Sequence, residues 1–133
     1  MKDPLKLIKT INILVADDME AIRTLVKASL KTVGANNIDI AYDGESAWKV
    51  LSNKKIGLII CDWDMPKMSG LDLLKKIKAS SEHKHIPFLL LTATTEKALV
   101  MQAVKAGVTD YLSKPFKPSE LEYRVVKMLR KVK

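Results

Sequence analysis

A short apolar run, LIIC at residues 58–61, stops at two carboxylates, Asp62 and Asp64. Continuous apolar runs of this length are typical of strands that are buried on both faces of a parallel sheet. An ionised side chain beside such a strand loses its hydration, which costs free energy unless a partner compensates. The sequence therefore predicts a central strand whose last carboxylate, Asp62, meets a partner supplied from elsewhere in the chain.

Strand and helix patterns alternate along the whole chain. We expect strands at residues 11–16, 38–41, 57–61, 87–91 and 110–113, each followed by a helix. In the helix expected at 19–33, five apolar residues keep helical spacing, and Arg23, Lys27 and Lys31 should point away into solvent. Five such units predict an α/β fold in which a five-stranded parallel sheet carries five helices on its two faces.

Composition fits one folded domain. The 133 residues, 47% of them hydrophobic, suffice for a single core, which we place at residues 11–133 after an N-terminal tail at 1–10. No apolar run approaches the roughly 20 residues that cross a bilayer, so membrane insertion is not expected. The single cysteine, Cys61, fits a small core residue in a reducing cytoplasm. The net charge of +8 comes without a nucleic-acid recognition motif, so direct nucleic-acid binding is not expected.

Polar side chains follow four of the five expected strands. In parallel sheets of this kind, ligands bind beyond the carboxyl ends of the strands, where the strand order reverses. We therefore expect one edge of the sheet to gather the residues Asp17, Asp18, Asp62, Thr92, Ala93, Ser113 and Lys114.

These residue types suggest a chemistry. Two like charges near 4 Å cost about 4 kcal/mol at an effective dielectric of 20, and a divalent cation removes that cost. The few oxygen ligands available favour Mg²⁺ over Ca²⁺. Lys114 supplies a compact positive charge for a phosphoryl group, Thr92 a hydroxyl donor, and Ala93 an accessible backbone N–H. The set suits phosphoryl transfer onto an aspartate.

Several fragments in register carry a family resemblance: VADDM, DWDMPKMSGLDLL, LLLTA and AGVTDYLSKPF. Residues 11–131 resemble response-regulator receiver domains, and within that family the single-domain chemotaxis regulators. The resemblance implies a flavodoxin-like, doubly wound sheet with strand order 2-1-3-4-5. It also implies a cytoplasmic two-component signalling domain, not an enzyme, that promotes only its own phosphorylation and dephosphorylation.

The resemblance also assigns roles at the acidic edge. Asp62 would accept a phosphoryl group from a sensor histidine kinase, and Lys114 would pair with that group. Asp18 would bind Mg²⁺ directly, Asp17 through a water, and Asp64 through its backbone carbonyl. The bond between Lys114 and the following proline is expected to be cis.

For the switch, the resemblance names Thr92 and Tyr111 as a coupled pair, and the accessible backbone N–H of Ala93 is expected to bind the phosphoryl group. The output surface would comprise helix four (about 96–106), strand five (110–113) and helix five (the last helix) of the expected five, and its target would be a flagellar motor switch protein. The residues expected on that surface are Lys97, Met101, Tyr111 and Phe116.

Asp64 departs from the chemotaxis pattern, which has asparagine there. Asp64 and Thr94 are therefore expected to tune the phosphoryl lifetime, and whether the usual phosphatase docks stays open. Two other functions remain open. One is a receiver of another two-component pathway, or of a longer regulator with a DNA-binding or enzymatic output. The other is a Mg²⁺-dependent phosphatase, which is disfavoured because no strand-end loop is long enough to enclose a substrate.

Overall fold

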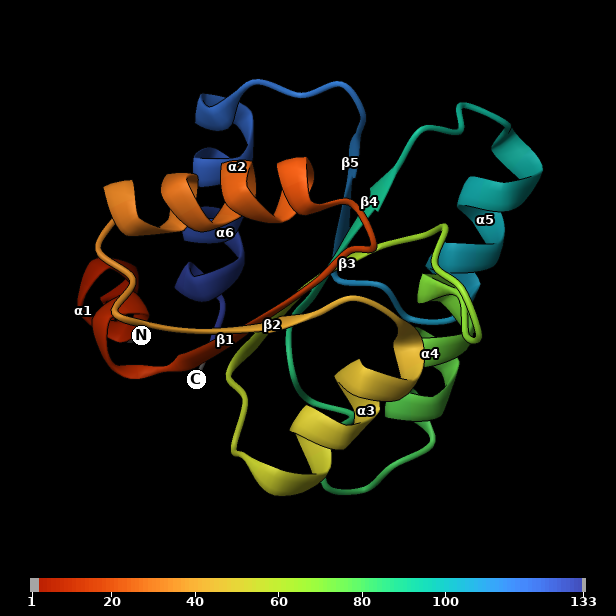
Figure 1. The fold of residues 1–133 in the computed structure, drawn as a ribbon, viewed down its shortest axis with the longest axis horizontal. Helices are drawn as coiled ribbons and strands as arrows, with labels where there is room; N and C mark the ends of the chain where they lie inside the picture. The colour runs from red at the N-terminus through yellow and green to blue at the C-terminus, as the bar shows by residue number, and fades with distance from the viewer. Residues whose placement is uncertain (1–2, 133) are drawn as a thin grey trace.

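A computed structural model describes residues 3–132 as alternating helices and parallel strands (Figure 1). The strands are β1 (Asn12–Ala16), β2 (Asn37–Ala41), β3 (Leu58–Asp62), β4 (Phe88–Thr92) and β5 (Asp110–Ser113). The helices are α1 (Pro4–Thr10), α2 (Glu20–Thr32), α3 (Gly44–Asn53), α4 (Gly70–Lys78), α5 (Lys97–Lys105) and α6 (Pro118–Arg130).

The five strands form one sheet in the order β2-β1-β3-β4-β5, and every neighbouring pair is parallel. The predicted strand order is therefore confirmed. The chain runs outward from β1 to β2 and then returns to place β3 on the other side of β1. The strand order thus reverses between β1 and β3, which is where ligands bind in sheets of this kind.

Alternate strand residues feed two separate cores. Leu58 and Ile60 of β3 lie in one core, while Ile59 and Cys61 lie in the other. Helices α1, α2 and α6 cover the first face, and α3, α4 and α5 cover the second (Figure 1). Because both faces are covered, β3 and β4 are buried along their whole length, which explains their continuous apolar sequences.

Helix α1 is the main departure from the predicted fold. The sequence led us to expect a tail at residues 1–10 and five helices, whereas Pro4–Thr10 is a sixth helix, and residues 1–2 lie outside the described part. The Asp3 carboxylate accepts a hydrogen bond from the Leu5 N–H at 2.9 Å, and a proline opens the first turn. The segment has too few turns for its periodicity to stand out. It forms because α1 packs against α6 and buries Ile8 completely.

The helices are short by the standards of a membrane span. α2 and α6 have 13 residues each, whereas a helix needs about 20 apolar residues to cross a bilayer. Within residues 3–132, no helix has both the length and the apolarity to do so.

Replacing Ile8 by alanine should lower the free energy of unfolding by about 2–5 kcal/mol, because it leaves a cavity between α1 and the core. Leu5→Ala is the matched control, since Leu5 lies in the same helix with 52% of its surface exposed. Urea unfolding measures both variants. Equal, small effects would show that α1 does not contribute to the folded core.

Candidate functional site

The carboxyl ends of four strands bring the predicted residues to one edge of the sheet. Ala16 of β1 pairs with Cys61 of β3. Asp17 and Asp62 are the next residues, so they lie side by side where the two strands end. On the other side of β3, the Lys114 N–H donates to the Thr92 carbonyl at 2.8 Å, which carries the chain on from β5 toward the same edge.

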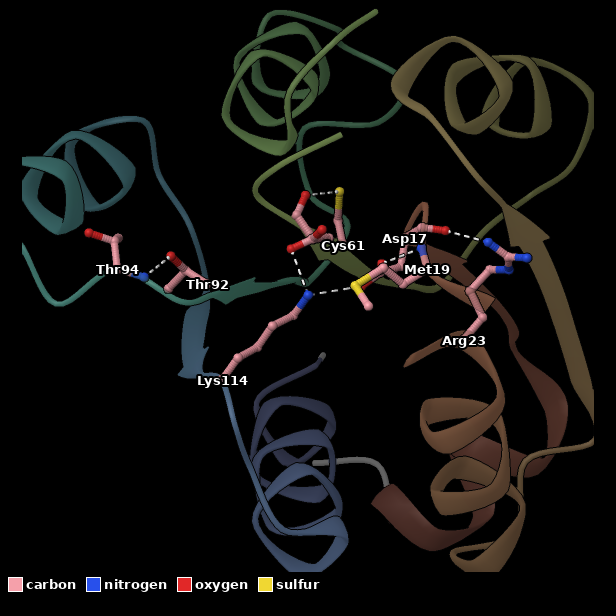
Figure 2. Close-up of polar contacts among 8 residues, drawn as sticks. Asp17, Met19, Arg23, Cys61, Thr92, Thr94 and Lys114 are labelled. Carbon is pink, nitrogen blue, oxygen red and sulfur yellow. Dashed lines mark hydrogen bonds and ion pairs between the residues drawn. The ribbon is translucent and has the colours of Figure 1, made fainter. Parts of the chain in front are cut away.

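Lys114 is the partner that Asp62 requires. Its ammonium Nζ donates to Asp62 Oδ1 at 2.9 Å and to Asp17 Oδ2 at 3.2 Å (Figure 2). The Lys114 side chain is 17% exposed, so the two ion pairs are shielded from water. The predicted convergence of the ends of β1, β3 and β5 is thus confirmed as geometry. The Lys114–Pro115 peptide bond is cis, as expected.

Three carboxylates lie close enough to share one cation. Asp17, Asp18 and Asp62 each offer an oxygen, and these oxygens lie within 4.8 Å of one another. Asp17 is fully buried and Asp62 is 5% exposed, whereas Asp18 is open to solvent. With Lys114 bound to two of the three carboxylates, the cluster has a formal charge of −2 (three negative charges and one positive). A hard divalent cation that needs few protein oxygens, such as Mg²⁺, fits that charge and donor set.

The pKa values of Asp62 and Lys114 depend on their burial and on their contact with each other. Loss of hydration raises the pKa of Asp62, and the negative charge of Asp17 adds to this, while the hydrogen bond from Lys114 acts in the opposite direction. Burial works to lower the pKa of Lys114, but its contacts with Asp62 and Asp17 outweigh that effect and raise it. Lys114 therefore remains a cation at neutral pH. Burial also raises the pKa of the Cys61 thiol, which agrees with its predicted place in the core.

Thr92 at the end of β4, Thr94 after it and Tyr111 on β5 are not hydrogen-bonded to the acid cluster within residues 3–132. The Thr92 hydroxyl, which is buried, accepts a hydrogen bond from the Thr94 N–H at 3.0 Å (Figure 2). The intervening Ala93 is exposed. The Tyr111 side chain is 37% exposed. Among the hydrogen bonds of the described residues, none joins Thr92 or Tyr111 to the three carboxylates.

The loop after β3 is held against Asp62 by a close backbone approach. The Gly70 N–H donates to the Trp63 carbonyl at 2.8 Å, and a Cβ built on Gly70 would overlap the Asp62 carbonyl oxygen. Glycine is therefore required for α4 to begin here. This contact fixes the short loop that carries Asp64, whose side chain is exposed.

Arg23 is a site residue that the sequence analysis missed. We expected it in solvent with Lys27 and Lys31, but its guanidinium Nη1 turns back and donates to the Asp17 backbone carbonyl at 2.8 Å (Figure 2). That expectation was wrong for Arg23, and the sequence could not reveal it, since the three basic residues recur every four positions along α2. Their spacing gives no signal that distinguishes the first from the others.

The residues expected on the output surface differ in their exposure. Lys97 and Met101 are exposed on α5, Met101 by 50%. Phe116, by contrast, is half-buried and packs against the core on the α6 side of the sheet. Val104 and Tyr123, which no sequence pattern pointed to, are 50% and 65% exposed on α5 and α6.

Asp62→Asn should stabilise the metal-free protein near neutral pH. Because the pKa of Asp62 is raised on folding, the folded state holds its proton more tightly, and stability falls as pH rises through that pKa. Asparagine has no proton to lose, so the gain should be present at neutral pH and vanish below the ordinary aspartate pKa of 3.8. Thermal unfolding in a chelator measures it. A variant less stable than wild type at neutral pH would contradict the raised pKa.

Comparison with known proteins agrees with this geometry. The family profile described as the response regulator receiver domain matches residues 13–126. The chain is 37% identical to the chemotaxis protein CheY-3 of Vibrio cholerae over 93% of this chain and 95% of that one. Among solved structures, the chemotaxis response regulator CheY4 of Vibrio cholerae has a TM-score of 0.83 at 30% identity, over 89% of this chain and 98% of CheY4.

A magnesium-bound structure is also similar. It is the receiver domain of the sensor histidine kinase PA1611 from Pseudomonas aeruginosa, with a magnesium ion coordinated in its active-site cleft. Its TM-score is 0.82 at 26% identity, over 91% of this chain and 98% of that one. Taken with the family profile and the acid cluster of Asp17, Asp18 and Asp62, these similarities show that the chain belongs to the response regulator receiver domain family.

Proposed function

We propose that this receiver domain is a phosphorylation switch in which Asp62 accepts a phosphoryl group from a sensor histidine kinase, with Mg²⁺ as cofactor. The observation that supports this most directly is the pair of contacts from Lys114 to Asp62 and Asp17 in a cluster of three carboxylates. A lysine held there offers a positive charge where the phosphoryl oxygens arrive.

In the proposed reaction a carboxylate oxygen of Asp62 attacks the phosphorus of a phosphohistidine. An O–P bond forms, the P–N bond breaks, and its electron pair returns to the histidine nitrogen. Lys114, already 2.9 Å from Asp62 Oδ1, shifts its hydrogen bonds toward the incoming phosphoryl oxygens. Ala93, whose backbone lies at the exposed end of β4, donates its N–H to another of these oxygens.

Asp18 and Asp62 would hold Mg²⁺ through their carboxylates and Asp64 through its backbone carbonyl, with Asp17 acting through a water. When bound, the ion neutralises the cluster and the developing charge on the phosphoryl group. The PA1611 receiver domain, which has magnesium in its active-site cleft, supports this assignment.

Phosphorylation adds about −1.5 to −2 charges and three strong acceptor oxygens. We propose that the Thr92 hydroxyl then turns to the phosphoryl group and that Tyr111 moves with it, which alters the surface of α5, β5 and α6. The exposed apolar residues Met101, Val104 and Tyr123 provide contact area for a protein target there. Because similar proteins such as CheY-3 are chemotaxis proteins, we propose a cytoplasmic role in chemotaxis with a flagellar motor switch protein as target.

Asp62→Asn should abolish phosphorylation by acetyl phosphate in the presence of Mg²⁺, because the amide cannot form the acyl phosphate. Intact-protein mass spectrometry measures the added phosphoryl group. Asp64→Asn is the control, since its side chain is exposed and it should still be labelled. Labelling of Asp62→Asn at the wild-type level would refute the proposed acceptor.

Asp64→Asn should change the rate of dephosphorylation at least severalfold. The exposed Asp64 carboxylate follows Asp62 by two residues, where it either repels attacking hydroxide or holds a water in place. Decay of the phosphorylated protein after removal of the phosphodonor measures the rate, and Thr94→Ala tests the second tuning position. A decay identical to wild type in Asp64→Asn would refute the tuning role of Asp64.

A further inference from the structure

Hydrogen bonds hold both the backbone and the carboxylate of Asp17. Its backbone N–H donates to the Ala41 carbonyl at 3.1 Å, and its backbone carbonyl accepts from Arg23 Nη1 at 2.8 Å. Its carboxylate accepts from the Met19 N–H through Oδ1 at 2.9 Å and from Lys114 through Oδ2 at 3.2 Å. With its side chain fully buried, Asp17 has its orientation set by these four contacts.

Arg23 is the one side chain among these partners that holds the backbone of Asp17. The Asp17 carbonyl lies beyond the end of β1 and before the first turn of α2, where neither a strand ladder nor a helix supplies a donor. Figure 2 shows the guanidinium reaching back from α2 to this carbonyl. A charged donor makes a stronger hydrogen bond than a neutral one.

We propose that Arg23 is a positioning residue for the acid cluster: by holding the Asp17 carbonyl, it keeps the Asp17 carboxylate aimed at Lys114 and at the cation-binding edge. The inference rests on the proposed Mg²⁺-dependent function. Residues that orient ligands from behind typically change metal affinity by about 10–100-fold when they are replaced. Arg23 differs from such partners in acting on the backbone of Asp17, which would reach the ion through a water.

Arg23→Met should therefore raise the Kd for Mg²⁺ about tenfold, measured by isothermal titration calorimetry. Lys27→Met is the matched control. Lys27 lies one turn further along α2, lines a surface groove together with Arg23 and Ile40, and makes no ion pair among those of the described residues. It should keep the wild-type Kd. Arg23→Lys, which retains a charged donor, should recover part of the loss.

A second measurement needs no metal. The amide of Met19 donates to Asp17 Oδ1, so its NMR chemical shift in metal-free protein reports how that carboxylate is oriented. The shift should move in Arg23→Met and stay in place in Lys27→Met. A structural role limited to α2 stability would lower the melting temperature without changing Mg²⁺ affinity in the folded protein.

Three results would overturn the proposal: an unchanged Kd in Arg23→Met, an equal loss in Lys27→Met, or an unmoved Met19 amide. An equal loss of Mg²⁺ affinity in Lys27→Met would show that positive charge in the groove, and not the contact between Arg23 and the Asp17 carbonyl, sets the affinity. If Arg23→Met does not fold, Arg23→Lys and its Met19 amide decide the question. If wild type itself does not bind Mg²⁺, the proposed function fails, and the metal-free amide comparison still tests the role of Arg23.

Discussion

The structure depends on a single constraint at the carboxyl ends of its strands: two buried carboxylates need a cation. Asp17 and Asp62 lose most of their hydration where β1 and β3 end, and like charges there repel each other. Lys114 reaches both from the end of β5, across β4, so β1, β3, β4 and β5 must be in place before the cluster is compensated. The site therefore forms only when these four strands have assembled.

One lysine does not neutralise the three carboxylates, and the remaining negative charge favours the binding of a cation. Three carboxylates and one ammonium leave a net negative edge, and burial raises the pKa of Asp62. Such a cluster gains from binding a cation, and the ion in turn favours the ionised form of Asp62, which is the proposed nucleophile. Stability is thus given up at the residue whose reactivity is needed.

The sequence predicted the sheet well because burial on both faces leaves a plain signature. The runs at 58–61 and 88–91 are apolar throughout, and the polar residues that end them identify the functional edge. Lys114, Asp17 and Asp62 could be placed together once the strands were assumed to be parallel.

Two features could not be predicted, each for a physical reason. Helix α1 has only two turns, and it forms through contact with α6, 108 or more residues away in sequence (Thr10 to Pro118), rather than through its own periodicity. Arg23 is a basic residue at the same spacing as Lys27 and Lys31, and only the path of the chain after β1 shows that it turns to the Asp17 carbonyl. Local patterns of apolar residues predict which positions are buried, whereas tertiary structure decides the direction of a long polar side chain.

Cys61 has a practical consequence. It is the one cysteine of the chain, and it lies fully buried in the sheet directly before Asp62, with a raised thiol pKa. Thiolates, not thiols, react with maleimides and disulfides, so this sulfur is shielded both sterically and chemically. A cysteine introduced on the exposed side of α5 or α6 can therefore carry a fluorophore or spin label in an otherwise native background, and movements of that face can be followed directly.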